Sequence, residues 1–240
     1  MTRATDFNLS SQCVLNIPLF EGIGLSYVKD DAPAHHPVQM IHSPTWVQLS
    51  SGVWVLDFDG TNDYLNIATA FAGDLKMSSA PGSTGFSGCA WVYADLITNM
   101  RAIIGCCGAW DTAGWGLFID SGSNRGVTLY RHGGDHKYAF TGEGTYAAYQ
   151  SAWCLVGFSY RAASAPYTMI FFNGLNYPLQ YGQDGVYVPV TNAYEFRMAW
   201  DREGSSKYDG KMGGQRVWQR WVSPAEHMQI FNAEREFFGV

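Results

Sequence analysis

The sequence predicts one all-β domain in which two antiparallel sheets pack as a sandwich or jelly roll, with a short helix near the C-terminal end. Short apolar and aromatic runs recur along the 240 residues, separated by clusters of Gly, Asn, Asp and Ser. Aromatic residues make up 15% of the chain and glycines number 27, which favours sheets over helices. All-β domains of this length are common, so a single domain over residues 1–240 is expected.

The expected strands follow one another at short spacing, which is typical of a sandwich. Alternation places Cys89, Trp91 and Tyr93 on one face of a central strand. The pair Asn173-Gly174 predicts a tight type I′ hairpin. The expected strands cover residues 13–18, 53–58, 63–67, 86–94, 101–105, 114–119, 126–131, 152–160, 167–172, 194–200 and 211–218.

Residues 223–235 are expected to form the helix. The tetrapeptide SPAE at 223–226 is a capping box with proline at the first helical position. Met228, Ile230 and Phe231 then lie close to one helical face, which predicts that the helix lies on the sandwich.

Composition excludes several classes of function. The net charge of -6 and the absence of a basic run argue against nucleic-acid binding. No stretch of about 18 apolar residues is present, so no membrane insertion is expected. Residues 1–7 lack the apolar core of a secretory signal, so none is expected.

The five cysteines are Cys13, Cys89, Cys106, Cys107 and Cys154, an odd count. Together with the missing signal, this count favours reduced, buried thiols. One disulfide, formed late in an oxidising environment, is the alternative.

Four segments resemble a known family. LNIPLFEGIG at 15–24 resembles its first strand and turn, and DFDGTNDYL at 57–65 is close to its F-D-G-x-x-D-Y-V stretch. Residues 153–160 resemble W-H-H-V-A-V-T-Y, with Cys154 and Leu155 in place of the histidines, and residues 209–231 resemble its closing motif. The chain thus resembles the laminin-G-like branch of the concanavalin A-like lectin/glucanase superfamily over residues 13–235. The resemblance implies a concanavalin A-like jelly-roll sandwich.

Calcium is the metal that this resemblance implies. Asp59, Asn62 and Asp63 supply oxygen atoms in a tight turn, and such oxygens are the ligands that Ca²⁺ takes. The alternative is that these residues only form the turn. Gly213-Gly214 departs from the family pattern of Ile-Asp, which bears on metal sites that need this acid.

Aromatic residues in or beside loops of the middle third are the candidates for ligand binding. Sugar rings stack on exposed Trp and Tyr faces. The alternative is that these side chains cover the edges of the sandwich. The candidates are Trp110, Trp115, Tyr130, Tyr138, Tyr146 and Tyr149.

No catalytic motif is visible, so no catalytic residue is predicted and the protein is not expected to be an enzyme. Glycoside hydrolysis needs two carboxylates flanking the scissile bond. In catalytic relatives these acids lie two to four residues apart on one strand, and no such group occurs here. A pair assembled from distant strands stays open, so a glycoside hydrolase is kept as an alternative.

These observations predict a non-catalytic recognition or assembly protein. A bacteriophage virion surface component, as a capsid decoration or a tail or fibre protein, explains a lone sandwich without an export signal. Its partners would be other virion proteins, copies of itself, and glycans. The alternative is a stand-alone lectin-like module that binds carbohydrate outside the cell or on its surface. The fold hosts both kinds of function.

Overall fold

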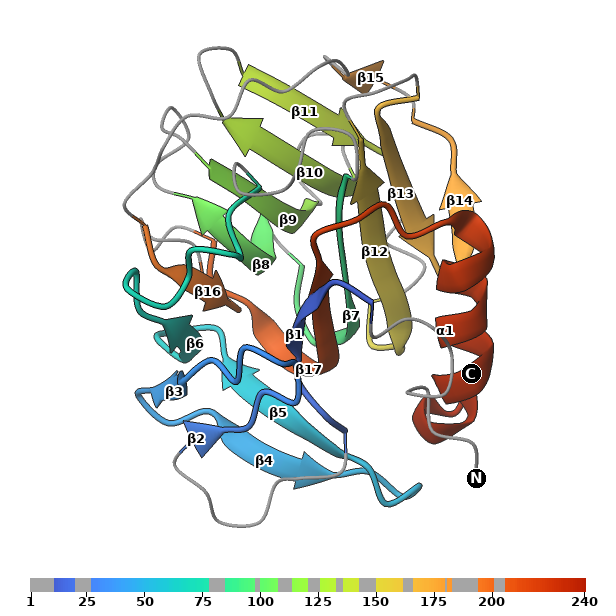
Figure 1. The fold of residues 1–240 in the computed structure, drawn as a ribbon. Helices are drawn as coiled ribbons and strands as arrows, with labels where there is room; N and C mark the ends of the chain where they lie inside the picture. Colours follow the sequence, from blue (N-terminus) through green and yellow to red (C-terminus); the bar gives the residue numbers. More distant parts are fainter. Residues whose placement is uncertain are drawn as a thin grey trace.

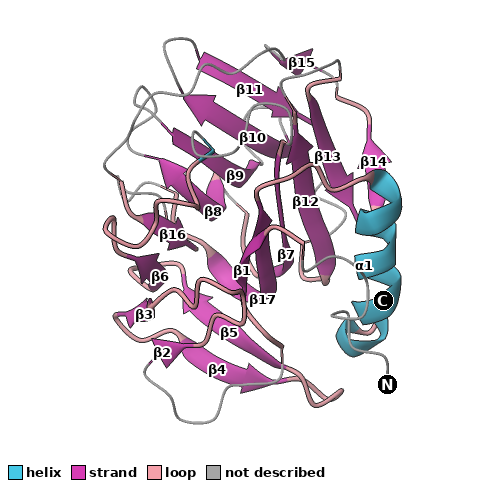
Figure 2. Cartoon of the chain, in the orientation of Figure 1, coloured by secondary structure: helices cyan, strands magenta, loops and turns pink. Residues whose placement is uncertain are grey.

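Two antiparallel sheets face each other, and a C-terminal helix lies against the outer face of one of them (Figures 1 and 2). This arrangement confirms the predicted sandwich. Among the residues that the structure describes, no helix is long and apolar enough to cross a membrane. The computed structural model describes residues 11–19, 27–77, 85–97, 100–107, 114–120, 126–132, 136–142, 150–161, 166–179, 181–182, 194–200 and 206–240.

Sheet A, which carries the helix, has eight strands in the order β14-β13-β12-β7-β17-β5-β4, with β1 beside β17. Its strands are β1 (Cys13–Asn16), β4 (Thr45–Gln48), β5 (Trp54–Asp59), β7 (Phe86–Ala94), β12 (Cys154–Tyr160), β13 (Thr168–Phe172), β14 (Leu175–Tyr177) and β17 (Asp209–Trp218).

Sheet B has nine strands in the order β15-β11-β10-β9-β8-β16-β6-β3-β2. They are β2 (Tyr27–Val28), β3 (Val38–Ile41), β6 (Tyr64–Ile67), β8 (Arg101–Cys107), β9 (Gly114–Asp120), β10 (Gly126–His132), β11 (His136–Phe140), β15 (Tyr181–Gly182) and β16 (Phe196–Met198).

The main core fills the space between the two sheets, and Trp115 lies at its centre. Its ring centroid is 5.0 Å from that of Phe86 and 5.3 Å from that of Phe158. Its indole N–H donates to the carbonyl of Leu75 at 2.8 Å, so the one polar atom of this buried side chain is satisfied. Burying an apolar side chain of this size stabilises the fold by about 1.5–3 kcal/mol.

Helix α1 (Pro224–Phe238) confirms the predicted helix. Ser223 and Glu226 form the predicted capping box, and Gly239 ends the helix with a left-handed backbone. The helix lies on the face of β7 that carries Cys89 and Trp91, and the Trp91 ring stacks on Phe238 with centroids 4.1 Å apart. Alternation along β7 therefore decides which face the helix covers.

A buried ion pair fastens the same helix to sheet A. The Arg216 guanidinium donates to both carboxylate oxygens of Glu234, at 2.5 and 3.1 Å. The indole N–H of Trp91 also donates to Glu234, at 2.8 Å. Glu234 is 3% exposed, so its charge depends on these donors.

The expected strands leave out six that the structure shows: β11, β14 and β15, and three more between residues 27 and 48. β2, β3 and β4 lie there, each two to four residues long. Runs this short and this polar carry little periodic signal. The predicted hairpin at Asn173-Gly174 is confirmed, because both residues have positive φ, 48° and 77°.

Cys13, Cys89, Cys106 and Cys154 are buried thiols, as predicted. Burial raises the pKa of Cys89 and of Cys106 to about 12 and the pKa of Cys13 to about 11, which keeps these groups protonated.

Candidate ligand-binding site

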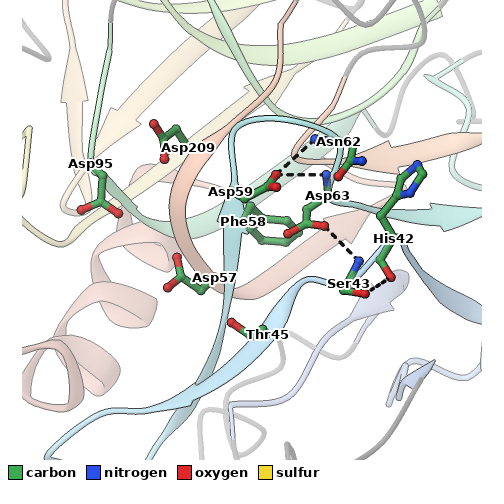
Figure 3. A pocket seen from close by; sticks show the side chains of 10 residues that line it. All are labelled: His42, Ser43, Thr45, Asp57, Phe58, Asp59, Asn62, Asp63, Asp95 and Asp209. Atoms are coloured by element: carbon green, nitrogen blue, oxygen red, sulfur yellow. Dashed lines mark hydrogen bonds between the residues drawn. The ribbon is translucent and has the colours of Figure 1, made fainter.

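An acidic pocket of about 750 Å³ opens where strands of sheet A meet the β5–β6 turn (Figure 3). Its carboxylates come from β5, from the turn that follows, from the segment after β7 and from the start of β17. We call this the acidic pocket. The residues that line it are His42, Ser43, Thr45, Asp57, Phe58, Asp59, Asn62, Asp63, Asp95 and Asp209.

The register of sheet A brings the pocket residues together. Thr45 of β4 lies opposite Asp57 of β5, and Asp57 lies opposite Lys211 of β17. Asp59 in turn lies opposite Asp209. Phe58, between the two β5 acids, belongs to the core between the sheets, so Asp57 and Asp59 project from the other face of sheet A.

The β5–β6 turn is organised around the carboxylate of Asp59. One oxygen accepts hydrogen bonds from the backbone amides of Thr61 at 2.8 Å, Asn62 at 3.1 Å and Asp63 at 3.4 Å. Partial desolvation would raise the pKa of Asp59, but these amide donors outweigh it and lower the pKa. Asp59 is therefore held ionised at the mouth of the pocket.

Asp63 ties this turn to the connection between β3 and β4. Its carboxylate accepts from the backbone amide of Ser43 at 2.9 Å, which fixes the residues just before β4 against the turn. Gly60 is required here, because a Cβ at this position would lie 2.8 Å from the Cβ of Asp209. The turn and the β17 acid are thus held at close range.

Lys211 is the cation among these acids. Its ammonium lies 3.5 Å from Asp95 and 3.7 Å from Asp57, and 5.1 Å from the ring centroid of Tyr93. Desolvation raises the pKa of Asp57, and nearby Asp95 adds to this, while Lys211 acts against it. The Trp153 ring lies 5.6 Å from that of Tyr93, so an aromatic pair borders the acids.

The three predicted metal ligands, Asp59, Asn62 and Asp63, do come together in the pocket. However, no three His, Cys, Asp or Glu side chains among the described residues converge in a way that could hold a metal ion. One oxygen each of Asp59 and Asp63 already accepts from backbone amides. These residues do not assemble the six to eight oxygens that Ca²⁺ takes, and calcium stays a prediction.

Trp115 is wrongly placed by the sequence analysis, which put it in or beside a loop as a sugar-stacking residue. It is fully buried within β9, in the core between the sheets. The expected strand over residues 114–119 is confirmed as β9, so Trp115 lies within a strand. No face of this ring is open to a sugar.

Tyr130 and Tyr138 lie on the outer face of sheet B, where they pack with Phe118. The two tyrosine centroids are 6.0 Å apart, and Tyr130 is only 5% exposed. Tyr130 therefore has little surface for a ligand, whereas Tyr138 is partly exposed. The remaining three candidates, Trp110, Tyr146 and Tyr149, lie outside the described residues.

Sequence reasoning missed Asp57, Asp95 and Asp209 as pocket residues. They belong to three different segments, and only the pairing of β17 with β5 and β7 brings them together. The available signal was the run VLDFD at 55–59, in which two acids alternate with apolar residues on a strand.

The comparisons with known proteins agree with this fold. A laminin-G-type model described as the concanavalin A-like lectin/glucanase superfamily matches residues 59–226, more than half of the chain. No match was found among curated proteins.

Three solved structures have the same arrangement. The receptor-binding domain of a botulinum neurotoxin C/D mosaic serotype has a TM-score of 0.68 at 10% identity, covering 94% of this chain and 52% of that one. The binding domain of Paraclostridial mosquitocidal protein 1 has a TM-score of 0.67 at 12% identity, and the match covers 97% of this chain and 56% of that one. The third structure is of botulinum neurotoxin type C, a toxin whose cell entry depends on interaction with two ganglioside molecules. Its TM-score is 0.63 at 10% identity, and the match covers 94% of this chain and 52% of that one.

This chain spans about half the length of those binding domains, and at such low identity the likeness shows the fold alone. The family model adds a match in sequence over the pocket turn, both sheets and the start of helix α1. The chain belongs to the concanavalin A-like lectin/glucanase superfamily.

Proposed function

We propose that this protein is a non-catalytic recognition domain that binds a glycan at the acidic pocket. The observation that carries the proposal is the gathering of five aspartates around one pocket in a lectin-type fold. Sugar hydroxyls are hydrogen-bond donors, and a carboxylate that accepts from them forms a charge-assisted hydrogen bond. The half-buried rings of Tyr93 and Trp153 offer apolar surface beside these acceptors.

A glycan microarray tests this proposal. The native protein is expected to bind a defined set of glycans, and Asp57→Asn with Asp95→Asn should weaken that binding by at least about tenfold. Asp31→Asn is the matched control, because Asp31 is an exposed acid paired only with Lys29 among the charged groups described around it. Running the array with calcium and with EDTA tests the calcium prediction as well. A blank array with folded protein would contradict the proposal.

One observation favours a glycoside hydrolase as a second candidate. Asp57 and Asp95 lie on either side of the same ammonium, and the raised pKa of Asp57 suits a proton donor. This candidate predicts turnover of a polysaccharide that Asp57→Asn abolishes. If incubation with a broad polysaccharide panel produces no new reducing ends, this candidate is ruled out.

A narrower hypothesis places the protein on the surface of a bacteriophage virion, with other virion proteins and copies of itself as partners. The alternative location is extracellular or at a cell surface. The hypothesis is compatible with the fold, because one fold hosts many unrelated functions. Its test is mass spectrometry of purified particles, together with the oligomeric state of the protein in solution. Absence from the particles would contradict it.

A further inference from the structure

A second group of side chains lies on the outer face of sheet B, where cations rest on aromatic rings. Tyr64 and Trp200 meet edge to face, with ring centroids 4.7 Å apart. The Arg197 guanidinium lies 4.7 Å from the Tyr64 centroid, and the Lys207 ammonium lies 5.3 Å from the Trp200 ring. We call Tyr64, Arg197, Trp200 and Lys207 the cation–aromatic cluster.

Backbone pairing builds this cluster. The amide of Tyr208 donates to the carbonyl of Ala199 at 2.8 Å, which brings Trp200 and Lys207 side by side. Arg101 donates to the carbonyl of Lys207 at 2.6 Å, so a further guanidinium lies next to the cluster. Three cationic side chains thus gather in a chain whose net charge is -6.

One donor of the cluster is unsatisfied. The indole N–H of Trp200 is buried without a hydrogen-bond partner among the described residues. Arg197 pairs with Glu195, whereas Lys207 has no carboxylate within ion-pair distance in the described part of the chain. Buried polar atoms in folded proteins nearly always have partners, so an unpaired N–H beside the Lys207 ammonium favours a ligand that brings a hydrogen-bond acceptor.

The cluster borders the acidic pocket through His42. This residue lines the pocket, and its ring centroid lies 6.4 Å from that of Tyr64. Figure 3 shows His42 at the edge of the pocket, with its imidazole turned away from the aspartates. Hydrogen-bond acceptors therefore lie on one side of His42, and cations on aromatic rings lie on the other.

We propose that the cation–aromatic cluster binds the carboxylate of an acidic sugar whose hydroxyl groups enter the acidic pocket. This inference rests on the proposed function and names the class of glycan. Lys207 and the indole N–H of Trp200 supply donors to the carboxylate. The aspartates repel a carboxylate and accept from hydroxyls, so the two charge patterns fix the direction in which the sugar lies.

The test compares matched glycans on the native protein. One arm carries sialylated glycans, a second arm carries uronic-acid glycans, and a third carries the corresponding neutral glycans. The native protein is expected to bind one acidic arm more tightly than its neutral counterpart, and added salt should reduce the difference. The acidic arm that binds identifies the source of the carboxylate.

Variants at Lys207 separate this inference from the proposed function. Lys207→Gln is expected to weaken binding of the acidic glycan about tenfold, and Lys207→Glu more, with binding of neutral glycans unchanged. Lys29→Gln is the matched control, because Lys29 is an exposed lysine in an ion pair with Asp31. Thermal melting confirms that each variant is folded.

The outcomes are distinct. If the native protein binds neutral and acidic glycans equally, and Lys207→Glu changes neither, the inference is overturned while the proposed function stands. If the native protein binds no glycan, the proposed function fails and this inference fails with it. Loss of acidic binding in Lys207→Glu alone supports the inference.

Discussion

Lys211 lies directly opposite Asp57 across the β5–β17 pair, and its ammonium is 3.7 Å from that carboxylate and 3.5 Å from Asp95. One cation on β17 therefore moderates the repulsion between an acid of β5 and an acid of the segment after β7. This arrangement keeps the acidic pocket open to a ligand that donates hydrogen bonds, because the carboxylates are balanced in part and are not neutralised. All three side chains are partly exposed, so the pairs contribute little to stability.

Removing this cation should change the titration of the pocket. In Lys211→Gln we expect the pKa of Asp57 to rise further, because the ammonium is the main group that opposes desolvation there. Measurement of the Asp57 carboxyl by NMR over pH 3–8 checks this. Lys29→Gln, at an exposed pair elsewhere, should leave the Asp57 titration where it is. An unchanged titration in Lys211→Gln would show that the ion pair is absent in solution.

His227 should make the fold sensitive to acid. Its ring is fully buried against Phe171 and contacts the hydroxyl of Ser159 at 3.1 Å, and burial lowers its pKa to about 3. Below its ordinary pKa of 6.5 the unfolded chain takes up a proton that the folded chain refuses. The contribution of the neutral His227 ring to the free energy of unfolding is therefore fully present above pH 6.5. It is lost as the pH falls below 6.5, by about 1.4 kcal/mol per pH unit.

The matched variant is His227→Gln. It is expected to be less stable than the native protein at pH 7 and to lose this part of the acid dependence. Urea unfolding at pH 7, 6, 5 and 4 measures both effects. If the free energies of unfolding of the two proteins changed equally with pH over this range, the result would contradict a buried neutral imidazole at His227.

His36 should act in the opposite direction. Its two ring nitrogens lie 2.7 Å from Asp30 and 2.8 Å from Asp74. Desolvation would lower the pKa of His36, but the hydrogen bonds to both aspartates outweigh it and raise the pKa to about 9. This stabilisation is fully present below pH 6.5 and is lost as the pH rises through 9.

The melting temperature at pH 6, 7.5 and 9 tests this behaviour. The native protein should lose stability relative to His36→Gln as the pH rises. A difference that stays constant with pH would show that His36 is neutral in the folded state. The effect is opposite in sign to that of His227, so the two histidines are separable in one series.

The pair of Arg216 and Glu234 should be essential for holding the helix. Glu234→Gln leaves a buried guanidinium without its counter-charge, and we expect a loss of about 3–5 kcal/mol in the free energy of unfolding. Asp31→Asn, at an exposed ion pair, should cost no more than about 1 kcal/mol. Guanidinium-induced unfolding of both variants measures the contrast. A small loss in Glu234→Gln would show that the helix is held by its apolar contacts alone.

Some features of the fold could be predicted because they depend on local patterns. Alternation identified the face of β7 that bears Trp91, and the capping box identified helix α1. Trp115 lies in an expected strand, but one sequence does not show which face of that strand packs between the two sheets, so its burial was not predicted. At Gly105, which pairs with Gly116, a Cβ would lie 2.8 Å from the Gly116 Cα, so the close approach of these two strands requires glycine at position 105.

The site itself could be predicted only in part. Asp59, Asn62 and Asp63 were identified because they are neighbours in sequence. Asp95 and Asp209 join them only through the register of β17 with β5 and β7, and register depends on tertiary pairing that one sequence does not display.

The most direct test of glycan recognition at the acidic pocket is a crystal structure of the protein with its highest-affinity array glycan. We expect sugar hydroxyls within hydrogen-bond distance of Asp57 or Asp95, between Lys211 and the β5–β6 turn. A glycan bound elsewhere, for example beside Tyr138 on the outer face of sheet B, with the acidic pocket empty, would contradict the assignment of this site.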